Sequence, residues 1–360
     1  MIISEAVDLW QFCKVFTAGK IYQKVVIPMW WNEERPKRKA LSKLCALLLA
    51  AVMLVSPLLA DGAYAQAGGN NAVVHSASIT ATDSATYLTL VTSEQVNFIF
   101  RYNRNEVSIY VVGAGAFPGA VSIGSNPIFT SGRWAGNTLH LTLTTMDGIM
   151  GYRSFWDQND NLVIRFRNPP SSLAVTRVAI DPGHGGLDRG AEGFRTDLPE
   201  AVINRQMSQL LAEELRRRGV TVLVLDTAPG MEISERVRRA EEFDADIFIS
   251  VHNNAARNAN ARGTEVYFYS VFSHVMAATT ARNVSTNLGT INRGTRRASF
   301  SITRSSQFIS VMVEAGFVTN REEYEKLITP SYQQRIAVGI ADAVVAVVTH
   351  SYPGTGRQFS

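Results

Sequence analysis

The stretch VAIDPGHGGLDRGAEG, residues 178–193, decides the fold class of the second half of this chain. It opens with an apolar run from Val178 to Ile180, which suits a buried strand and is too short for a helix. Glycines surround His184 in the loop that follows and allow the backbone to approach a ligand closely: Gly183, Gly185, Gly186 and Gly190. A strand that runs into such a loop predicts a site at the carboxyl edge of a sheet.

Downstream of this loop, strand-like and helix-like segments alternate along the chain. Residues 201–218 place an apolar residue every three or four positions, which predicts a helix that ends before Gly219. Further helices are expected over 233–243, 274–288 and 332–349, and further strands over 220–225, 247–251, 265–269 and 309–313. This alternation predicts an α/β layer domain over residues 175–352.

Two more apolar strands end in a side chain that can bind a metal or a proton. Residues 247–251 lead into His252, and residues 309–313 lead into Glu314. Glu200 stands at the start of the 201–218 helix, where a carboxylate also complements the helix dipole. His184, Glu200 and His252 form a donor set of two imidazoles and one carboxylate, which suits catalytic zinc with an open position for water.

Four ordered motifs identify a family resemblance that covers about half of the chain. They are residues 178–193, an E-x-x-x-N motif with Glu200 and Asn204, ERVRRAEEFDADIFISVHNN with Arg236 and His252, and VMVEAGFVTN with Glu314 and Asn320. In these motifs the chain resembles zinc-dependent N-acetylmuramoyl-L-alanine amidases. The resemblance implies an α/β catalytic domain with a mixed sheet, and the amide between N-acetylmuramic acid and L-alanine of peptidoglycan as substrate.

The same resemblance implies roles for individual residues. Zinc would be held at His184, Glu200 and His252, and Glu314 would be the catalytic residue. Some relatives carry an inserted inhibitory helix after the strand that corresponds to residues 265–269. Here residues 270–273 leave no room for it, so we expect an enzyme without that segment.

Several alternatives stay open at the level of sequence. Asp181 and Asp188 are expected to shape the glycine-rich loop through local hydrogen bonds. Arg236 either orients the site or forms a structural ion pair. A wall-binding or regulatory protein that keeps the fold without turnover is the alternative function, and a zinc hydrolase that cuts elsewhere in the stem peptide is a third.

The region before the α/β domain has a different pattern. Residues 74–167 contain short alternating apolar runs broken by turn residues, which predicts an all-β domain of the sandwich type. It weakly resembles the AMIN-type modules that localise amidases to the cell wall, and a plain spacer domain is the alternative. Residues 168–174 are expected to be a linker, because Pro169 and Pro170 cannot continue a strand ladder.

The first 65 residues are interpreted as a leader. Basic residues precede an uncharged run from Leu44 to Ala60 and an A-x-A pattern at 63–65, as in a signal peptide, with translation starting at Met29. An uncleaved membrane anchor is the alternative. Export places the protein in the periplasm or at the cell wall, and both cysteines, Cys13 and Cys45, lie within this leader.

The charge pattern bears on partners. The chain has 35 basic and 31 acidic residues, and the leader contains eight of the former and five of the latter. The remainder is therefore close to neutral, and its arginine clusters lie on expected helices beside glutamates. We expect peptidoglycan as partner and no nucleic acid, and leave open a divisome or activator protein.

Overall fold

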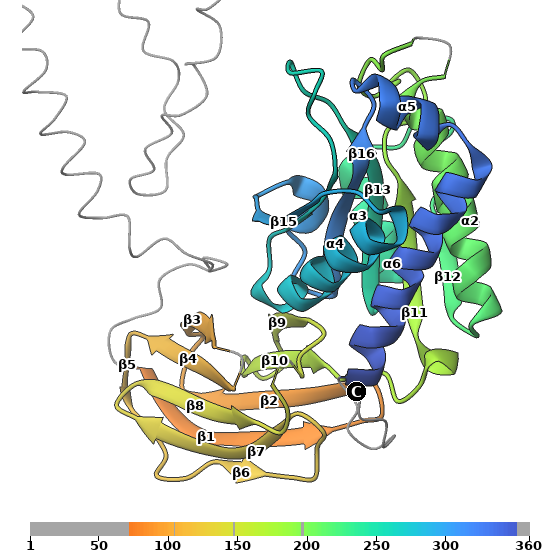
Figure 1. Ribbon diagram of the computed structural model, residues 1–360. Coiled ribbons are helices and arrows are strands. Elements are labelled where there is room, and N and C mark those ends of the chain that lie inside the picture. The colour runs from red at the N-terminus through yellow and green to blue at the C-terminus, as the bar shows by residue number, and fades with distance from the viewer. Residues whose placement is uncertain (1–71, 104, 147, 196–197, 351–360) are drawn as a thin grey trace, which may run out of the picture. The chain divides into compact units, whose positions relative to one another are not determined.

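A computed structural model describes residues 72–350, except 104, 147, 196 and 197 (Figure 1). The predicted leader, its cleavage pattern and the start at Met29 lie outside the described residues. Among the helices of the described part, none is long and apolar enough to cross a membrane.

Every regular element between residues 72 and 167 of the described part is a strand. One sheet has the order β5 (Ala114–Ala116), β1 (Ala72–Ala81), β2 (Ala85–Thr92), β10 (Leu162–Arg167) and β9 (Tyr152–Trp156), with β6 (Ser122–Ile123) beside β1. The other has the order β3 (Asn97–Tyr102), β4 (Glu106–Val112), β8 (Thr138–Leu143) and β7 (Phe129–Ala135). Buried side chains from both sheets form one apolar cluster, in which Leu88 and Ile164 of the first sheet join Ile109 and Leu139 of the second.

The rest of the chain forms a mixed sheet with helices on both faces. The strand order is β12 (Thr221–Val224), β11 (Arg177–Pro182), β13 (Ile247–Asn254), β16 (Ile309–Phe317), β14 (Thr264–Phe268) and β15 (Asn292–Arg297). The first four strands are parallel, and β14 runs antiparallel to β16. The predicted mixed-sheet α/β fold is therefore confirmed.

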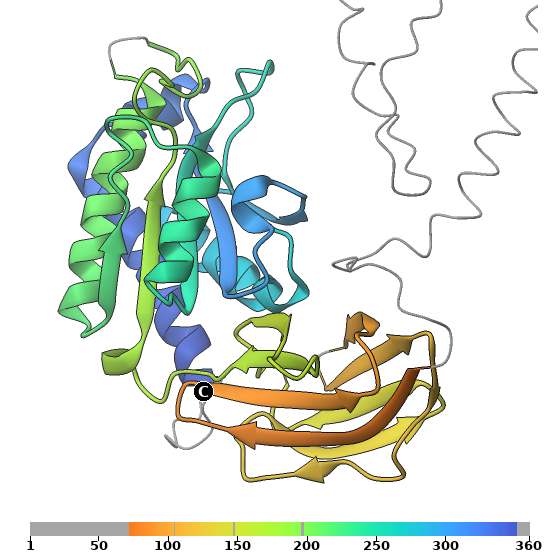
Figure 2. The same cartoon turned by 180° about the vertical axis from the view of Figure 1, so that it is seen from behind.

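Alternate residues of β11 supply the cores on the two faces of this sheet. Val178 and Ile180 pack in the cluster that contains α2 (Glu200–Arg217), α4 (His274–Leu288) and α6 (Pro330–His350). Ala179 packs on the opposite face with α3 (Ile233–Glu242) and the short helix η4 (Ser301–Thr303). Figures 1 and 2 show these two faces in turn.

The helix periodicity of the sequence matches the structure closely. The α2 helix buries Ile203, Met207, Leu211 and Leu215 on one face, and Gly219 after it takes a φ of 89°. In the α/β part, the strand β15 and the helix α5 (Arg321–Leu327) had no prediction. The sequence of β15, NRGTRR, has no apolar alternation, and the strand exists because its backbone pairs with β14.

The structure corrects the expected ends of two strands. Both β13 and β16 continue past Val251 and Val313, so His252 and Glu314 lie within strands and not after them. The reason is backbone pairing, because the parallel ladder continues and places His252 directly beside Glu314.

The last residue of β10 contacts the α/β part. The Nη1 of Arg167 lies 3.1 Å from Oδ1 of Asp246, and its Nε donates to the carbonyl of Gln307 at 3.1 Å. Both Arg167 and Asp246 are buried. On the other side of the contact, Phe272 packs in the apolar cluster of the two β sheets. A buried ion pair thus joins the end of the β region to the start of β13.

We expect Arg167→Ala to lower the free energy of unfolding by about 3 kcal/mol, because it leaves a buried carboxylate without its partner. Urea unfolding followed by circular dichroism measures this. The matched control is Arg153→Ala, an exposed arginine of β9, which should change stability by less than about 0.5 kcal/mol. Equal effects of the two substitutions would contradict the structural role of Arg167.

Candidate metal centre

Three of the side chains singled out by sequence meet at the carboxyl edge of the mixed sheet. His184 follows β11, Glu200 is the first residue of α2, and His252 lies in β13. One atom from each lies within 4.8 Å of the others. The Nε2 of His184 is 3.1 Å from Oε2 of Glu200, and Nδ1 of His252 is 3.2 Å from Oε1 of the same carboxylate. Two ligand atoms that are each about 2.1 Å from a tetrahedral ion are separated by slightly more than these two nitrogen–oxygen distances. The donor set therefore fits a divalent metal.

Two glycines lie directly beside the three candidate ligands. A Cβ at Gly183 would lie 2.3 Å from Nε2 of His252. A Cβ at Gly190 would lie 2.5 Å from Oε2 of Glu200 and 2.7 Å from Cδ2 of His184. The absence of side chains at these glycines leaves room for the three ligands to converge.

His184 has a φ of 68°, in the left-handed region that non-glycine residues rarely adopt. Its carbonyl accepts a hydrogen bond from Nη2 of Arg236 at 3.0 Å, and its Nδ1 is 2.7 Å from Oδ2 of Asp188. These contacts hold the ring in a strained backbone position, which is typical of functional sites. Asp188 therefore does more than shape the loop, because it fixes the orientation of the imidazole.

The carboxylate of Glu200 is buried and fully engaged. It accepts hydrogen bonds from the backbone N–H groups of Ala191 at 2.6 Å and Asn253 at 3.1 Å, and from Nδ2 of Asn204 at 3.1 Å. Asn253 had no assigned role in the sequence, since its contribution is a backbone N–H that any residue type would offer.

At this edge of the sheet, the pKa of Glu200 is lowered and the pKa of His184 is raised. Burial opposes ionisation of Glu200, but hydrogen bonds from His184 and His252 hold the pKa of its carboxyl well below the usual range. Burial also disfavours the charged form of His184, yet the hydrogen bond and charge of Glu200 outweigh it and raise the pKa of that imidazole to about 9. Without a metal, the carboxylate of Glu200 therefore stabilises a proton on His184, and this imidazole must lose that proton before it can bind a metal.

An ion pair between Arg236 and Asp181 supports the glycine-rich loop that contains His184. Nη1 of Arg236 lies 3.0 Å from Oδ1 of Asp181, and the hydroxyl of Ser250 donates to Oδ2 of Asp181 at 2.6 Å. Asp181 therefore links β11 to β13 and α3, where the sequence predicted only a local turn. Arg236 combines both of its predicted roles, because it forms this buried ion pair and also holds the carbonyl of His184.

Glu314 lies beside these groups in a cavity of about 620 Å³ that is also lined by His184, Glu200 and His252. It is buried, and its Oε2 has no hydrogen-bond partner among the described residues. Burial raises the pKa of its carboxyl to about 7. An unpartnered, buried carboxyl that titrates near neutrality can exchange protons with a substrate in this cavity.

Comparison with known proteins agrees with these observations. Residues 178–346 match the family model described as N-acetylmuramoyl-L-alanine amidase. The protein YqiI of Bacillus subtilis (strain 168) is 34% identical over 172 residues, which are 46% of this chain and 82% of YqiI. This chain belongs to the N-acetylmuramoyl-L-alanine amidase family.

Two further relatives, one from sequence and one from solved structures, differ in how much of their length this chain covers. The N-acetylmuramoyl-L-alanine amidase LytC of Bacillus subtilis (strain 168) is 32% identical over 47% of this chain, which spans only 35% of LytC. Among solved structures, the N-acetylmuramoyl-L-alanine amidase AmiC2 of Nostoc punctiforme is 33% identical, with a TM-score of 0.46 over 48% of this chain and 97% of that one.

Replacing Gly190 should impair metal binding although Gly190 offers no ligand atom. We expect Gly190→Ala to weaken the binding of a divalent ion, probed with zinc, by about tenfold or more, because the new Cβ would displace Glu200 and His184. Competition with a chromophoric chelator measures the affinity. Gly289→Ala is the matched control, since Gly289 also has a positive φ but nothing within 4 Å of the added Cβ. Unchanged zinc affinity in Gly190→Ala would show that the close packing is not needed.

Proposed function

We propose that this protein hydrolyses the amide bond between the lactyl group of N-acetylmuramic acid and L-alanine of the stem peptide, using zinc held by His184, Glu200 and His252. The observation that carries the proposal is the buried Glu314, which lines the same cavity as a two-histidine, one-carboxylate donor set and whose Oε2 has no hydrogen-bond partner among the described residues. Membership of the amidase family supports the choice of bond.

Bound zinc would supply Lewis-acid chemistry, by polarising the scissile carbonyl and making water a better nucleophile at neutral pH. The protein's contribution is to hold the three ligands rigidly. Glu200 is anchored by three hydrogen bonds apart from those to the histidines, and His184 is oriented by Asp188. This anchoring limits the rearrangement needed when substrate enters.

Glu314 is the proton carrier in this proposal. Its carboxylate takes the proton of the attacking water and then delivers it to the leaving nitrogen of L-alanine. Burial raises the pKa of this carboxyl, which makes it a better proton acceptor than an exposed glutamate, and the protonated form can then give the proton to the leaving nitrogen. The carboxyl faces the cavity from within a strand, so its position is set by the sheet and not by a loop.

Sequence patterns support proposals for the remaining parts of the chain. We propose that residues 1–65 direct export, that residues 74–167 form a β domain that localises the enzyme at the wall, and that residues 168–174 connect it to the catalytic domain. Relatives include the probable cell wall amidase LytH of Staphylococcus aureus, 24% identical over 54% of this chain. Action on peptidoglycan outside the cytoplasm, in wall remodelling or daughter-cell separation, is consistent with these assignments.

Glu314→Gln should lower kcat by about 10² to 10⁴ and leave zinc content unchanged, because it removes the proton carrier and no metal ligand. Labelled peptidoglycan is digested, and the released ends are identified by mass spectrometry. Glu322→Gln, an exposed glutamate of α5, is the control and should behave as wild type. New L-alanine amino termini with free lactyl groups are required. Intact sugar–peptide linkages would exclude this amidase activity, and cleavage within the stem would identify a peptidase.

The connection between β14 and α4 predicts an enzyme that needs no activator. Only Tyr269, Ser270 and the short helix η3 (Val271–Ser273) lie between these elements, which leaves no inserted helix to cover the metal centre. We expect the purified, zinc-loaded protein to release peptide without any partner protein. Initial rates with and without a membrane extract test this, and a rise above about tenfold on adding the extract would contradict it.

A further inference from the structure

The cavity around the candidate metal centre adjoins a second cavity, on the face of the sheet that α3 and η4 cover. This second cavity, about 440 Å³, lies between α3 and η4, and we refer to it as the α3–η4 groove. Ile233 and Ser301 line both cavities. A molecule bound at the metal centre can therefore extend into the groove without leaving the surface of the catalytic domain.

Among the described residues that line the groove, Arg304, Glu232 and Glu241 have no ionic partner, and the carboxylate of Glu241 accepts a hydrogen bond from the hydroxyl of Ser305 at 3.0 Å. Arg304 is exposed, and its guanidinium donates a hydrogen bond to the hydroxyl of Ser301. Glu232 is the N-cap residue of α3, but its side chain makes no capping hydrogen bond. The other arginine of the groove, Arg238, is already engaged by glutamates of its own helix.

Two exposed apolar side chains line the cavity at the metal centre, and one of them, Ile233, also lines the α3–η4 groove. Ile233 is 47% exposed and Phe300 is 42% exposed, and both line the cavity at the metal centre. Exposed apolar side chains beside a polar groove are typical of a surface that a ligand covers. A ligand with a small apolar side chain next to the scissile bond and charged groups farther along would match this arrangement, in which apolar side chains lie near the metal centre and charged ones lie in the groove.

Of the two halves of the proposed substrate, the peptide fits the groove better. The lactyl carboxyl is consumed in the amide, so the N-acetylated sugar has no charge near the bond. The peptide begins with the methyl side chain of alanine and carries carboxylates, together with an ammonium group on any diamino residue. Unpaired charges of both signs in the groove complement such a peptide and have no counterpart on the sugar.

We infer that the α3–η4 groove binds the stem peptide of the substrate, with Arg304 against a carboxylate and Glu232 against an ammonium group. The inference rests on the proposed amidase function and adds the direction in which the substrate lies. The sugar then lies on the other side of the metal centre, away from α3.

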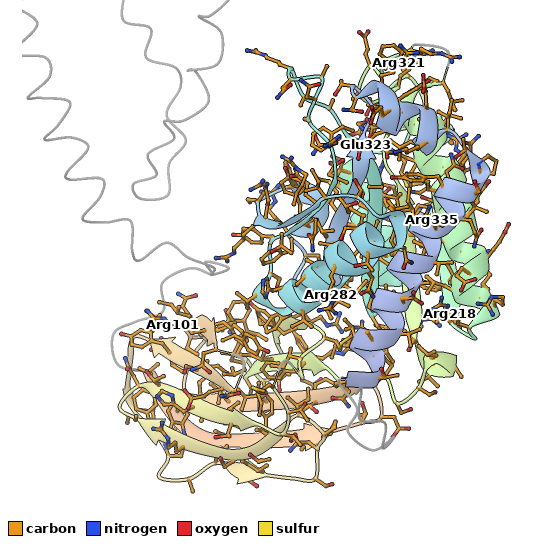
Figure 3. All side chains as sticks on the ribbon, in the orientation of Figure 1. Arg101, Arg218, Arg282, Arg321, Glu323 and Arg335 are labelled. Carbon is orange, nitrogen blue, oxygen red and sulfur yellow. The ribbon has the colours of Figure 1, made fainter. Side chains whose placement is uncertain are left out.

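The test uses three soluble probes: N-acetylmuramoyl-L-alanyl-D-glutamyl-L-lysine, the same compound with every carboxyl amidated, and the same compound with the lysine amine acetylated. Zinc-loaded wild type, Arg304→Gln and Glu232→Gln are compared by steady-state kinetics. The controls are Arg282→Gln, an exposed arginine of α4 on the opposite face of the sheet (Figure 3), and Glu213→Gln, an exposed glutamate of α2.

With wild type, each modification of the probe should raise KM about fivefold with little change in kcat. Arg304→Gln should raise KM by the same factor for the unmodified probe, lose its response to amidation and keep its response to acetylation. Glu232→Gln should show the reverse pattern, so each variant controls for the other. Arg304→Lys should restore part of the response to amidation, and neither control should differ from wild type.

Two results would overturn the inference while the proposed function stands. They are wild-type KM values that do not respond to the modifications, and variants whose KM rises equally for all three probes. A different result separates the two proposals: if wild type releases L-alanine-terminated peptide from none of the probes but remains folded and zinc-loaded, the amidase function itself fails, and with it the assignment of the groove.

Discussion

The buried carboxylate of Glu200 is the constraint on which the rest of the site depends. A charge with 2% exposure is unfavourable unless it is paired and hydrogen-bonded. Here two imidazoles, two backbone N–H groups and the amide of Asn204 surround it. The glycine-rich loop, the first turn of α2 and strand β13 must therefore meet at one point, and a change in any of them leaves this charge unsatisfied.

The sheet supplies the rigidity that this arrangement needs. Three parallel strands, β11, β13 and β16, are neighbours and bring His184, His252 and Glu314 to the same edge, although long stretches of chain separate them. Because His252 and Glu314 lie within paired strands, their backbones are held by ladder hydrogen bonds. A candidate base on a strand is placed more firmly than one on a loop, which suits a group that must meet both water and a leaving nitrogen.

Most elements could be predicted because apolar periodicity reports which face of a segment is buried. The α4 helix was expected over the residues that it occupies, and α2 differs by one residue at each end. In contrast, β15 was missed because an arginine-rich edge strand has no apolar pattern, and its pairing with β14 is a backbone interaction between distant segments. The ends of β13 and β16 were placed too early for the same reason, since pairing with a neighbour lengthens a strand beyond its apolar run.

The sequence by itself determined the chemical types at the site, because ligand and proton-transfer chemistry depends on side-chain identity and the motifs carry those identities in order. Only the tertiary structure decided which groups meet. It joined Asp188 to the ring of His184, connected Asp181 to Ser250 and Arg236, and gave Oε2 of Glu314 no hydrogen-bond partner within the described part of the chain. The contact of Asp188 with His184 depends on the fold of one loop, and the others join different elements and depend on strand order and register, which no local pattern of residues encodes.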